Sequence, residues 1–189
     1  MNIIEKKISG VFEISFLTII DDRGYNLRTY DDKVFEYFGI RRNWVQESQT
    51  RLDKRGIIRG LHFQFPPYGE SKLVRCIRGS VQDVFADLRK DSPTFGRWES
   101  VELNDYNKRM LFLPRGIANG YCSLSEGAEV INKVDNYYSK DHESGIIWND
   151  NRLNIRWSAE NPSVSEKDSK LLTLDEFVSQ YKFIEEEYK

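Results

Sequence analysis

Short runs of apolar, aromatic and β-branched residues recur along most of the chain, and residues that favour turns separate them. Such runs fit strands that lie half buried on a pleated surface. Turn signals stand between them, for example Arg78-Gly79-Ser80 and Ser125-Glu126-Gly127. Many short strands at this spacing indicate a sandwich, a jelly roll or a barrel, because two sheets must cover each other's apolar faces. The predicted strands cover residues 11–19, 44–48, 57–64, 72–79, 80–89, 98–103, 109–114, 119–124 and 128–134.

Two helices are predicted beside the strands. Residues 31–39 begin with Asp31 as a cap and end at Gly39. Residues 173–189 begin with Thr173 and Glu176 at the spacing of a capping box. Apolar residues then recur at helical intervals, namely Phe177, Val178, Tyr181 and Ile184. We interpret this stripe as a face that packs on a sheet, and not as a binding surface.

Size and charge limit the classes of function. A chain of 189 residues is usually one domain and is long enough to bury its own core. The formal charge of -2 argues against a general electrostatic grip on nucleic acid or an anionic membrane, so any anion binding must be local. Residues 1–20 mix Glu and Lys into their apolar positions, which fits neither a signal peptide nor a membrane span. We therefore expect a cytoplasmic protein that has neither nucleic acid nor membrane as a partner.

Cysteine and histidine are too scarce for several kinds of site. Cys76 and Cys122 are too few for a disulfide framework or a zinc site, and we expect both to be small buried hydrophobic residues. The only histidines, His62 and His142, cannot supply the several imidazoles of a metal site in a β-barrel. The chain also carries no glycine-rich phosphate loop, nucleophile elbow or paired CxxC. We predict no metal and no cofactor.

A cluster of polar residues occupies the strand-rich middle of the chain. Alternate residues of a strand share a face, so His62 and Gln64 are expected to project to one side and Arg59 to the other. If the histidine side lined a barrel, His62 would offer a titratable nitrogen inside a cavity. Without further context a lone strand histidine is more often structural, and lysines and asparagines are more often surface or loop residues. The cluster comprises Arg59, His62, Gln64, Lys72, Arg75, Asp83, Asp87, Asn119 and Asn132.

Five longer motifs add more specific information: GIIRGLHFQFPPY, KLVRCIRGSVQDVFADLRKDSPTFGRW, LPRGIANGY, NYYSKDHESGIIWND and VSEKDSK. Together they resemble the dTDP-4-dehydrorhamnose 3,5-epimerase family, and the match runs in order from Asp22 to about Asp168. The resemblance implies an all-β, cupin-type jelly-roll β-barrel with short flanking helices, formed as one domain over residues 1–189. It also implies a reaction without metal or cofactor, in a homodimer whose subunits lend N-terminal residues to each other's sites.

The resemblance also implies roles for individual residues. His62 would be the catalytic base, oriented by Asp168, and Lys72 would stabilise the oxygen of an enolate. Ser48 stands where the family has asparagine, and Tyr138 matches an aromatic residue that packs near the nucleotide base. The residues implied in substrate binding are Arg23, Arg28, Gln46, Ser48, Arg59, Asn119, Asn132, Tyr138, Glu143 and Lys167.

The chemistry of a 4-keto sugar agrees with these roles. The ketone acidifies the hydrogens on C3 and C5, because removal of either gives an oxyanion shared with the carbonyl. An enzyme then needs a base near neutral pKa, a cation at the oxyanion, and a donor that returns the proton from the opposite face. His62 and Lys72 supply the first two, and arginines can grip the diphosphate. The predicted activity is epimerisation next to the ketone of a nucleoside-diphosphate 4-keto-6-deoxyhexose.

The chain departs from the family at the groups that could return the proton. The family pattern AEFLYKTT carries a tyrosine acid where AEVINKVD has Asn132, and PxGxAHGF carries a histidine where PRGIANGY has Asn119. Asparagine cannot titrate. We therefore expect inversion at C3 only, with the proton returned by water or by another tyrosine such as Tyr30 or Tyr121.

The sequence leaves alternatives for substrate and activity. Asn26 and Arg28 replace an aromatic residue and an acid near the ligand, so cytidine- or guanosine-linked sugars compete with the thymidine-linked sugar of the family. Epimerisation at both C3 and C5, and a sugar 3,4-ketoisomerase reaction, are alternative activities. The alternative outside enzymes is a homologue that binds a nucleotide sugar without turning it over.

Overall fold

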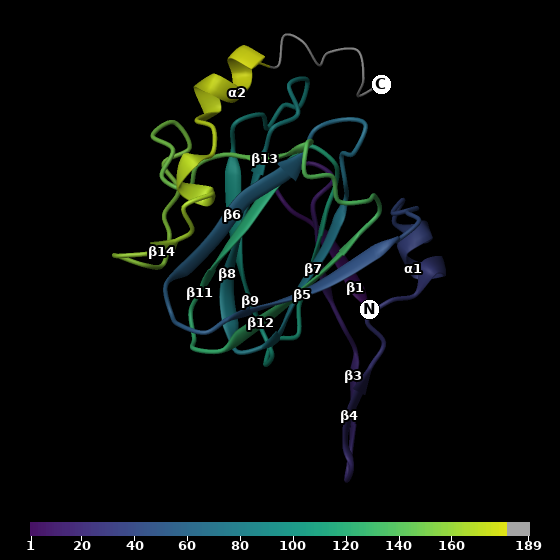
Figure 1. Ribbon diagram of the computed structural model, residues 1–189. Helices are drawn as coiled ribbons and strands as arrows, with labels where there is room; N and C mark the ends of the chain where they lie inside the picture. Colours follow the sequence, from purple (N-terminus) through teal and green to yellow (C-terminus); the bar gives the residue numbers. More distant parts are fainter. Residues whose placement is uncertain (181–189) are drawn as a thin grey trace.

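Residues 1–180 are described by the computed structural model, in which two β-sheets pack into a barrel (Figure 1). In order across it, the first sheet contains β1 (Asn2–Glu5), β2 (Phe12–Ser15), β10 (Met110–Leu113), β7 (Lys72–Arg78), β12 (Ala128–Val134) and β5 (Gln46–Leu52). The second contains β13 (Glu143–Gly145), β6 (Ile57–Gln64), β11 (Ile117–Ser123), β8 (Ser80–Asp87) and β9 (Trp98–Asn104), with β14 (Ser163–Val164) beside β6. The all-β jelly-roll prediction with short flanking helices is confirmed.

The inner faces of the two sheets form one apolar core. Alternation along the strands sends Val74 of β7 and Val130 of β12 inward from the first sheet, where they meet Phe85 of β8 and Leu103 of β9 from the second. All four side chains are fully buried. This core borders the polar residues described in the next subsection, since Phe85 pairs with Asn119 on β11.

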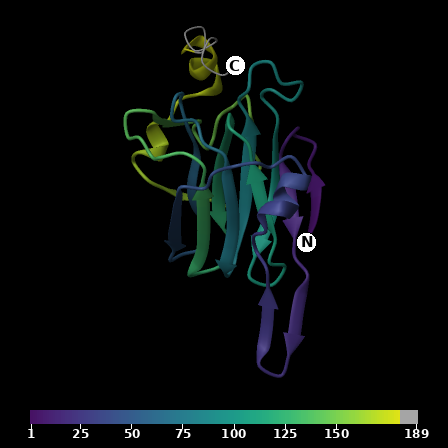
Figure 2. The same ribbon diagram turned by 90° about the vertical axis from the view of Figure 1, so that its right-hand side faces the viewer.

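Each sheet has a second apolar layer on its outer face. Phe35 of α1 (Asp32–Tyr37) packs on Ile14 and Phe112 of the first sheet. Phe177 of α2 (Leu174–Gln180) packs on Leu61 and other residues of the second sheet. Figure 2 shows α1 on one side of the barrel and α2 at its upper end. The helices therefore cover sheet faces, as the apolar stripes predicted.

The helix ends agree only in part with the prediction. Thr173 and Glu176 form the expected capping box, because the Glu176 carboxylate accepts from the Thr173 amide at 2.7 Å and the Glu176 amide donates to the Thr173 hydroxyl at 3.2 Å. Asp31 is the N-cap residue of α1, but its side chain makes no capping bond and accepts from Arg28 instead. The remainder of the predicted C-terminal helix, with Tyr181 and Ile184, lies outside the described residues.

The predicted strand at 11–19 is divided into two elements. β2 ends at Ser15, and β3 (Thr18–Asp21) leaves the barrel to pair only with β4 (Gly24–Leu27). The resulting hairpin projects well beyond the barrel (Figures 1 and 2). It carries apolar side chains into solvent, since Leu17 is 75% exposed, Ile20 is 77% exposed and Tyr25 is 61% exposed.

The prediction for the two cysteines is confirmed. Cys76 and Cys122 are free and buried, and burial raises the pKa of the Cys76 thiol to about 11, as expected for inert packing residues. In residues 1–180, neither helix has the length and apolar composition that a membrane crossing requires.

A β-bulge in β6 decides which side chains enter the barrel. Asn119 of β11 pairs with His62 and Tyr121 pairs with Arg59, so two steps along β11 correspond to three along β6. Directly paired residues share a face of the sheet, and Asn119 and Tyr121 also share one. Arg59 and His62 therefore both face the barrel interior. The prediction that they project to opposite sides is wrong, because strict alternation fails across the extra residue.

Gly60 makes this bulge possible. Its φ is +119°, and an added Cβ would lie 2.5 Å from the Cα of Gly120 and 2.7 Å from the carbonyl oxygen of Asn119. The missing side chain thus makes room for the backbone of β11, and not for a bound sugar. Only glycine fits a position with both this dihedral and this contact.

We expect Gly60→Ala to lower the free energy of unfolding by more than about 3 kcal/mol, because the methyl group would force β6 and β11 apart. Gly24→Ala is the matched control: its φ is also positive, at +126°, but nothing lies within 4 Å of the added atom. That variant carries only the cost of the positive φ and is expected to lose about 1–2 kcal/mol. Urea unfolding at one protein concentration measures both, and equal losses would contradict the steric explanation.

Candidate active site

His62 and Asp168 form a hydrogen-bonded pair inside the barrel. The Nε2 atom of His62, on β6, lies 2.8 Å from Oδ1 of Asp168, which begins the short 3-10 helix η1 (Asp168–Lys170). The second carboxylate oxygen accepts from the backbone N–H of Gly60 at 3.1 Å. With Nε2 donating to Asp168, Nδ1 of His62 carries the lone pair, and the ring can accept a proton there.

The environment of Asp168 keeps it ionised. Burial acts to raise the pKa of this carboxyl. The hydrogen bond from His62, the positive charge of His62 and the backbone N–H of Gly60 outweigh burial, so the pKa of Asp168 lies below its ordinary value. The Asp168 side chain is only 5% exposed, whereas that of His62 is 24% exposed. A buried carboxylate thus supports a partly accessible imidazole, which is the arrangement that stabilises an imidazolium after proton uptake.

Lys72 reaches the same place from the first sheet. Its residue is only 8% exposed, so it is not a surface lysine. Its Nζ donates to the carbonyl oxygen of His62 at 3.1 Å and lies 3.4 Å from Oε1 of Glu70. An ammonium group has three N–H donors, so at least one is available for an oxyanion beside the imidazole. The sequence analysis did not predict Glu70 as a partner of Lys72. The only sequence feature that could have indicated it is its position two residues before Lys72.

Four predicted binding residues meet at the rim of the barrel. The Glu143 carboxylate accepts from Lys167 at 2.6 Å and from the Tyr138 hydroxyl at 2.7 Å, and the Gln46 side chain accepts from the Tyr138 amide at 2.7 Å. Burial acts to raise the pKa of Glu143, but the bonds from Lys167 and Tyr138 lower it below its ordinary value. The hydrogen bond to Glu143 in turn raises the pKa of Tyr138. More than half of Tyr138 is exposed, so its ring is free to pack on a ligand.

The interior wall between the rim and the core is polar. Ser48 on β5 pairs with Asn132 on β12, and both face inward, in alternation with the core residues Leu52 and Val130 of the same strands. Arg59 also faces inward and is nevertheless exposed, as Ser48 is. Because these residues point into the barrel and still reach solvent, they can contact a ligand beside His62.

Asn119 is engaged with a buried carboxyl. Its Nδ2 donates to Oδ1 of Asp83 at 2.7 Å and to the carbonyl oxygen of Val84 at 3.1 Å. Asp83 is fully buried, and among the described residues its Oδ2 is the buried side-chain atom without a hydrogen-bond partner. Burial raises the pKa of Asp83 well above its usual range, although Asn119 and the charge of Lys72 act to lower it. Asn119 therefore supports Asp83 and does not itself offer a titratable group.

Other predicted residues lie away from this barrel. Arg23 is in the turn of the β3–β4 hairpin and pairs with Asp21, and Arg28 follows the hairpin and pairs with Asp31 at 3.0 Å. Neither belongs to the interior that contains His62 in the same chain (Figure 1).

Two members of the polar cluster are also not part of the site. Arg75 alternates with the inward residues of β7 and so faces the outer side, where its charge interacts with Glu47. Asp87 is the last residue of β8 and organises a loop by accepting from Arg89, Ser92 and Thr94. Alternation thus turns Arg75 away from the site, and the loop after β8 engages Asp87.

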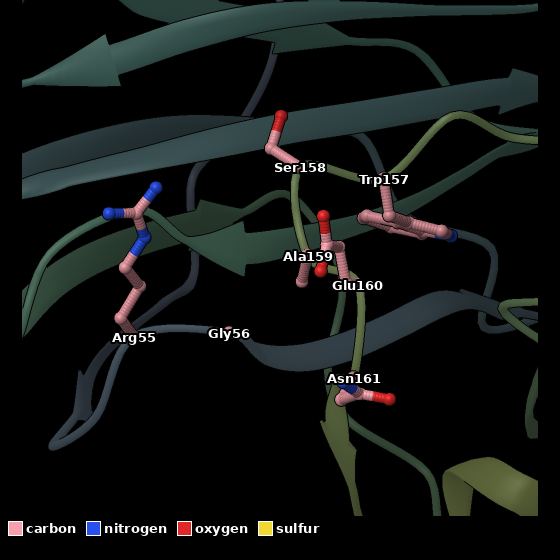
Figure 3. Close-up of a pocket in the computed structure, with 7 residues that line it drawn as sticks. All are labelled: Arg55, Gly56, Trp157, Ser158, Ala159, Glu160 and Asn161. Atoms are coloured by element: carbon pink, nitrogen blue, oxygen red, sulfur yellow. The ribbon is translucent and has the colours of Figure 1, made fainter.

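A cavity of about 590 Å³ opens elsewhere on the surface (Figure 3). Arg55 and Trp157 border opposite sides of it, and Gly56 lies on its floor just before β6. Gly56 precedes His62 by six residues, which is roughly 20 Å along a strand. None of the predicted site residues lines this cavity, so it is separate from the polar interior.

The polar interior therefore brings together the imidazole of His62 with the carboxylate of Asp168, the ammonium group of Lys72 and the guanidinium group of Arg59. These groups can remove a proton from a carbon acid, stabilise the oxyanion that results and hold an anionic ligand. In residues 1–180, no group of three or more His, Cys, Asp or Glu side chains is arranged to hold a metal ion.

Comparison with known proteins gives one consistent result. The sequence model of the family described as dTDP-4-dehydrorhamnose 3,5-epimerase matches residues 5–176. The dTDP-4-dehydrorhamnose 3,5-epimerase of Shigella flexneri is 43% identical over 182 residues, which cover 94% of this chain and all of that protein. The dTDP-4-dehydrorhamnose 3-epimerase of Streptomyces niveus is 36% identical over 170 residues, or 89% of this chain and 82% of that protein.

A solved structure shows the same similarity in three dimensions. The dTDP-4-dehydrorhamnose 3,5-epimerase of Bacillus anthracis, crystallised with TDP and PPi bound, superposes with a TM-score of 0.89. It is 40% identical in sequence, and the alignment covers 91% of this chain and 98% of that one.

The contact between Asp168 and His62 gives a pH-dependent prediction. Because the pKa of Asp168 is lower in the folded state, the stability from its ionised form is present above the unfolded pKa of about 3.9 and is lost as the pH falls through the folded value. We expect Asp168→Asn to lose about 1–3 kcal/mol of unfolding free energy at pH 7, and much less near pH 3.

Denaturant unfolding of both proteins between pH 7 and pH 3 measures this difference. Asp53→Asn is the control, because the Asp53 side chain is 76% exposed in its pair with Arg51 and is expected to change stability by less than about 0.5 kcal/mol. A gap for Asp168→Asn that stays constant down to pH 3 would argue that the ionised carboxylate is not its source.

Proposed function

The chain belongs to the dTDP-4-dehydrorhamnose 3,5-epimerase family, and from that premise we propose that it is a cofactor-independent epimerase of a nucleoside-diphosphate 4-keto-6-deoxyhexose. The observation that carries the proposal is the pairing of His62 with Asp168 beside Lys72 in an open barrel interior. The whole chain, 1–189, acts as one epimerase domain. Both cysteines are free, which suits a cytoplasmic protein.

The proposed reaction begins with removal of a proton next to the ketone. Nδ1 of His62 takes the proton, and the electron pair of the broken C–H bond enters an enolate whose negative charge lies on the ketone oxygen. Lys72 donates a hydrogen bond to that oxygen. Asp168 stabilises the imidazolium that His62 becomes. Return of a proton to the opposite face of the carbon then inverts its configuration.

We propose that inversion takes place at C3 only. Positions 119 and 132 hold asparagine, so two groups in the interior wall cannot act as acids. A relative of 36% identity is named as a 3-epimerase, which supports single inversion as a property that occurs among similar proteins. Inversion at both C3 and C5 is the alternative within the enzymes, and binding without turnover is the alternative outside them.

We propose a thymidine diphosphate sugar as the substrate, because the relatives are named for it and a similar structure holds TDP. Arg59 on the interior wall and Lys167 at the rim are the cations that would bind the diphosphate. Gln46, Tyr138 and Glu143 would surround the thymine base of the nucleotide. Cytidine and guanosine diphosphate sugars are the competitors, since rim residues that are largely exposed can accept other bases.

Solvent exchange tests the reaction. We expect incubation of dTDP-4-keto-6-deoxyglucose with the protein in D₂O to place deuterium at C3 and not at C5, as followed by proton NMR. His62→Asn is expected to lower exchange at C3 by at least about 100-fold while nucleotide affinity changes by less than about tenfold. Equal labelling of C3 and C5 would reject single inversion, and migration of the carbonyl would indicate a ketoisomerase.

Exchange experiments need a control for general damage. His142→Asn removes the same ring from the other histidine, whose Nδ1 bonds Ser139 and whose ring packs on Tyr68. That variant is expected to retain exchange within about threefold. Exchange at the wild-type rate in His62→Asn would remove this residue from the mechanism, and no exchange in the wild-type protein would favour a binding protein.

We also propose a homodimer in which the β3–β4 hairpin reaches the partner's barrel. The hairpin projects from its own barrel and exposes Leu17, Ile20 and Tyr25, and such a group of apolar side chains is usually covered by a partner. Arg23 lies in the turn of this hairpin. In the proposed dimer, each subunit would therefore place its Arg23 in the barrel of the other subunit.

Subunit complementation tests this arrangement. Arg23→Ala and His62→Asn are each expected to reduce activity by tenfold or more, but a heterodimer of the two, purified through two different tags, is expected to regain about half of wild-type activity because one of its sites is intact. The matched control is a heterodimer of an Arg59→Ala subunit and a His62→Asn subunit. Both residues belong to the same barrel, so neither site is intact and no activity is expected to return. Absence of recovery in the first heterodimer would show that Arg23 does not serve the partner's site.

A further inference from the structure

Tyr121 spans the barrel beside His62. It is on β11, faces inward between Arg59 and Asp83 in the second sheet, and is only 6% exposed. Thr50 on β5 and Asn132 on β12 of the first sheet are close enough to its hydroxyl group to lower the pKa of the phenol as side-chain hydrogen-bond partners. The phenol therefore starts on the wall that carries His62 and ends on the facing wall.

Inward-facing residues next to this hydroxyl reach solvent. Asn132 is only partly buried, and its partner Ser48 is exposed although it faces inward. Arg59, whose charge is close enough to lower the pKa of Tyr121, is also exposed. A sugar ring held between His62 and the first sheet would therefore have the imidazole on one face and the phenol oxygen toward the other.

Inversion requires an acid on the face opposite the base, and the described residues offer few. Lys72 contacts the backbone of His62 itself, so it lies on the side of the base. Asp83 is fully buried beneath Asn119 and has no exposed surface. Tyr30 packs its ring on Phe35 of α1, with centroids 5.0 Å apart, in the layer outside the barrel. Tyr121 is the candidate whose hydroxyl reaches the facing wall.

We propose that Tyr121 is the catalytic acid that returns the proton to the sugar carbon from the face opposite His62, an inference that rests on the proposed epimerase activity. The phenol O–H bond breaks as the new C–H bond forms, and the electron pair of the enolate returns from oxygen to carbon. The phenolate that is left takes a proton from water, and the imidazolium of His62 releases one, so the enzyme regains its starting state without any other reactant.

The surroundings of Tyr121 suit this role. Burial raises the pKa of the phenol, while the hydrogen bond to Thr50 and the charge of Arg59 act to lower it. The hydroxyl is therefore protonated at neutral pH, as an acid must be, and Arg59 stabilises the phenolate formed by the transfer. The amide of Asn132 cannot donate a proton to carbon, but it can donate a hydrogen bond to the phenol oxygen and hold it in place.

Tyr121→Phe tests the inference by separating exchange from inversion. With His62 intact, the variant is expected to exchange deuterium into C3 of dTDP-4-keto-6-deoxyglucose within about tenfold of the wild-type rate, because the base can return the proton to the same face. Formation of the inverted sugar is expected to fall by at least about 100-fold. Tyr106→Phe is the control, since it removes a hydroxyl from a tyrosine that is 93% exposed, and it is expected to match the wild type.

A second variant guards against a purely structural effect. Adding Asn132→Tyr to Tyr121→Phe returns a phenol to β12, and inversion is expected to recover by at least about tenfold over the single variant. Inversion at the wild-type rate in Tyr121→Phe, while the wild-type protein is active, would overturn the inference alone. Equal loss of exchange and inversion would also overturn it. No exchange by the wild-type protein would overturn the proposed function and the inference with it.

Discussion

The carboxylate of Asp168 is the contact on which the site depends. One oxygen fixes the ring of His62 and the other holds the backbone of Gly60, so a residue of the C-terminal part of the chain supports both the base and the bulge that aims it. These residues are 106 and 108 positions from Asp168 along the chain. The barrel must therefore be complete, with η1 docked on β6, before the imidazole has its carboxylate.

The barrel divides into a part that is filled and a part that is open. Along β7 the inward residue Val74 is followed toward the rim by Lys72, and along β12 the inward residue Val130 is followed by Asn132, which pairs with Val74. Alternation continues unchanged across this boundary, so the same strands build the core and the cavity. The buried carboxyl of Asp83 lies where core and polar residues meet, and its Oδ2 atom lacks a hydrogen-bond partner.

The sequence was most informative where local pattern decides structure. The strand at 128–134 has the predicted limits, and the capping box at Thr173 was read from spacing alone. Strand number and turn chemistry left a sandwich, a jelly roll and a barrel open, and the resemblance to the family selected the jelly roll. The pairing of His62 with Asp168 was not accessible to pattern, because only the family motifs linked residues so far apart. The face of Arg59 was predicted wrongly, since it depends on how closely Gly60 approaches Gly120 on another strand.

The extra residue in β6 gives the two halves of that strand opposite parity. Before it, odd-numbered residues such as Arg59 look into the barrel, and after it even-numbered ones such as His62 do. Loss of one residue between Arg59 and His62 would remove the bulge and still leave both side chains facing the interior, whereas the present length without a bulge would transfer one of them to the apolar layer beneath α2. The odd spacing of the two residues is thus compatible with a shared cavity only because the strand carries one unpaired residue.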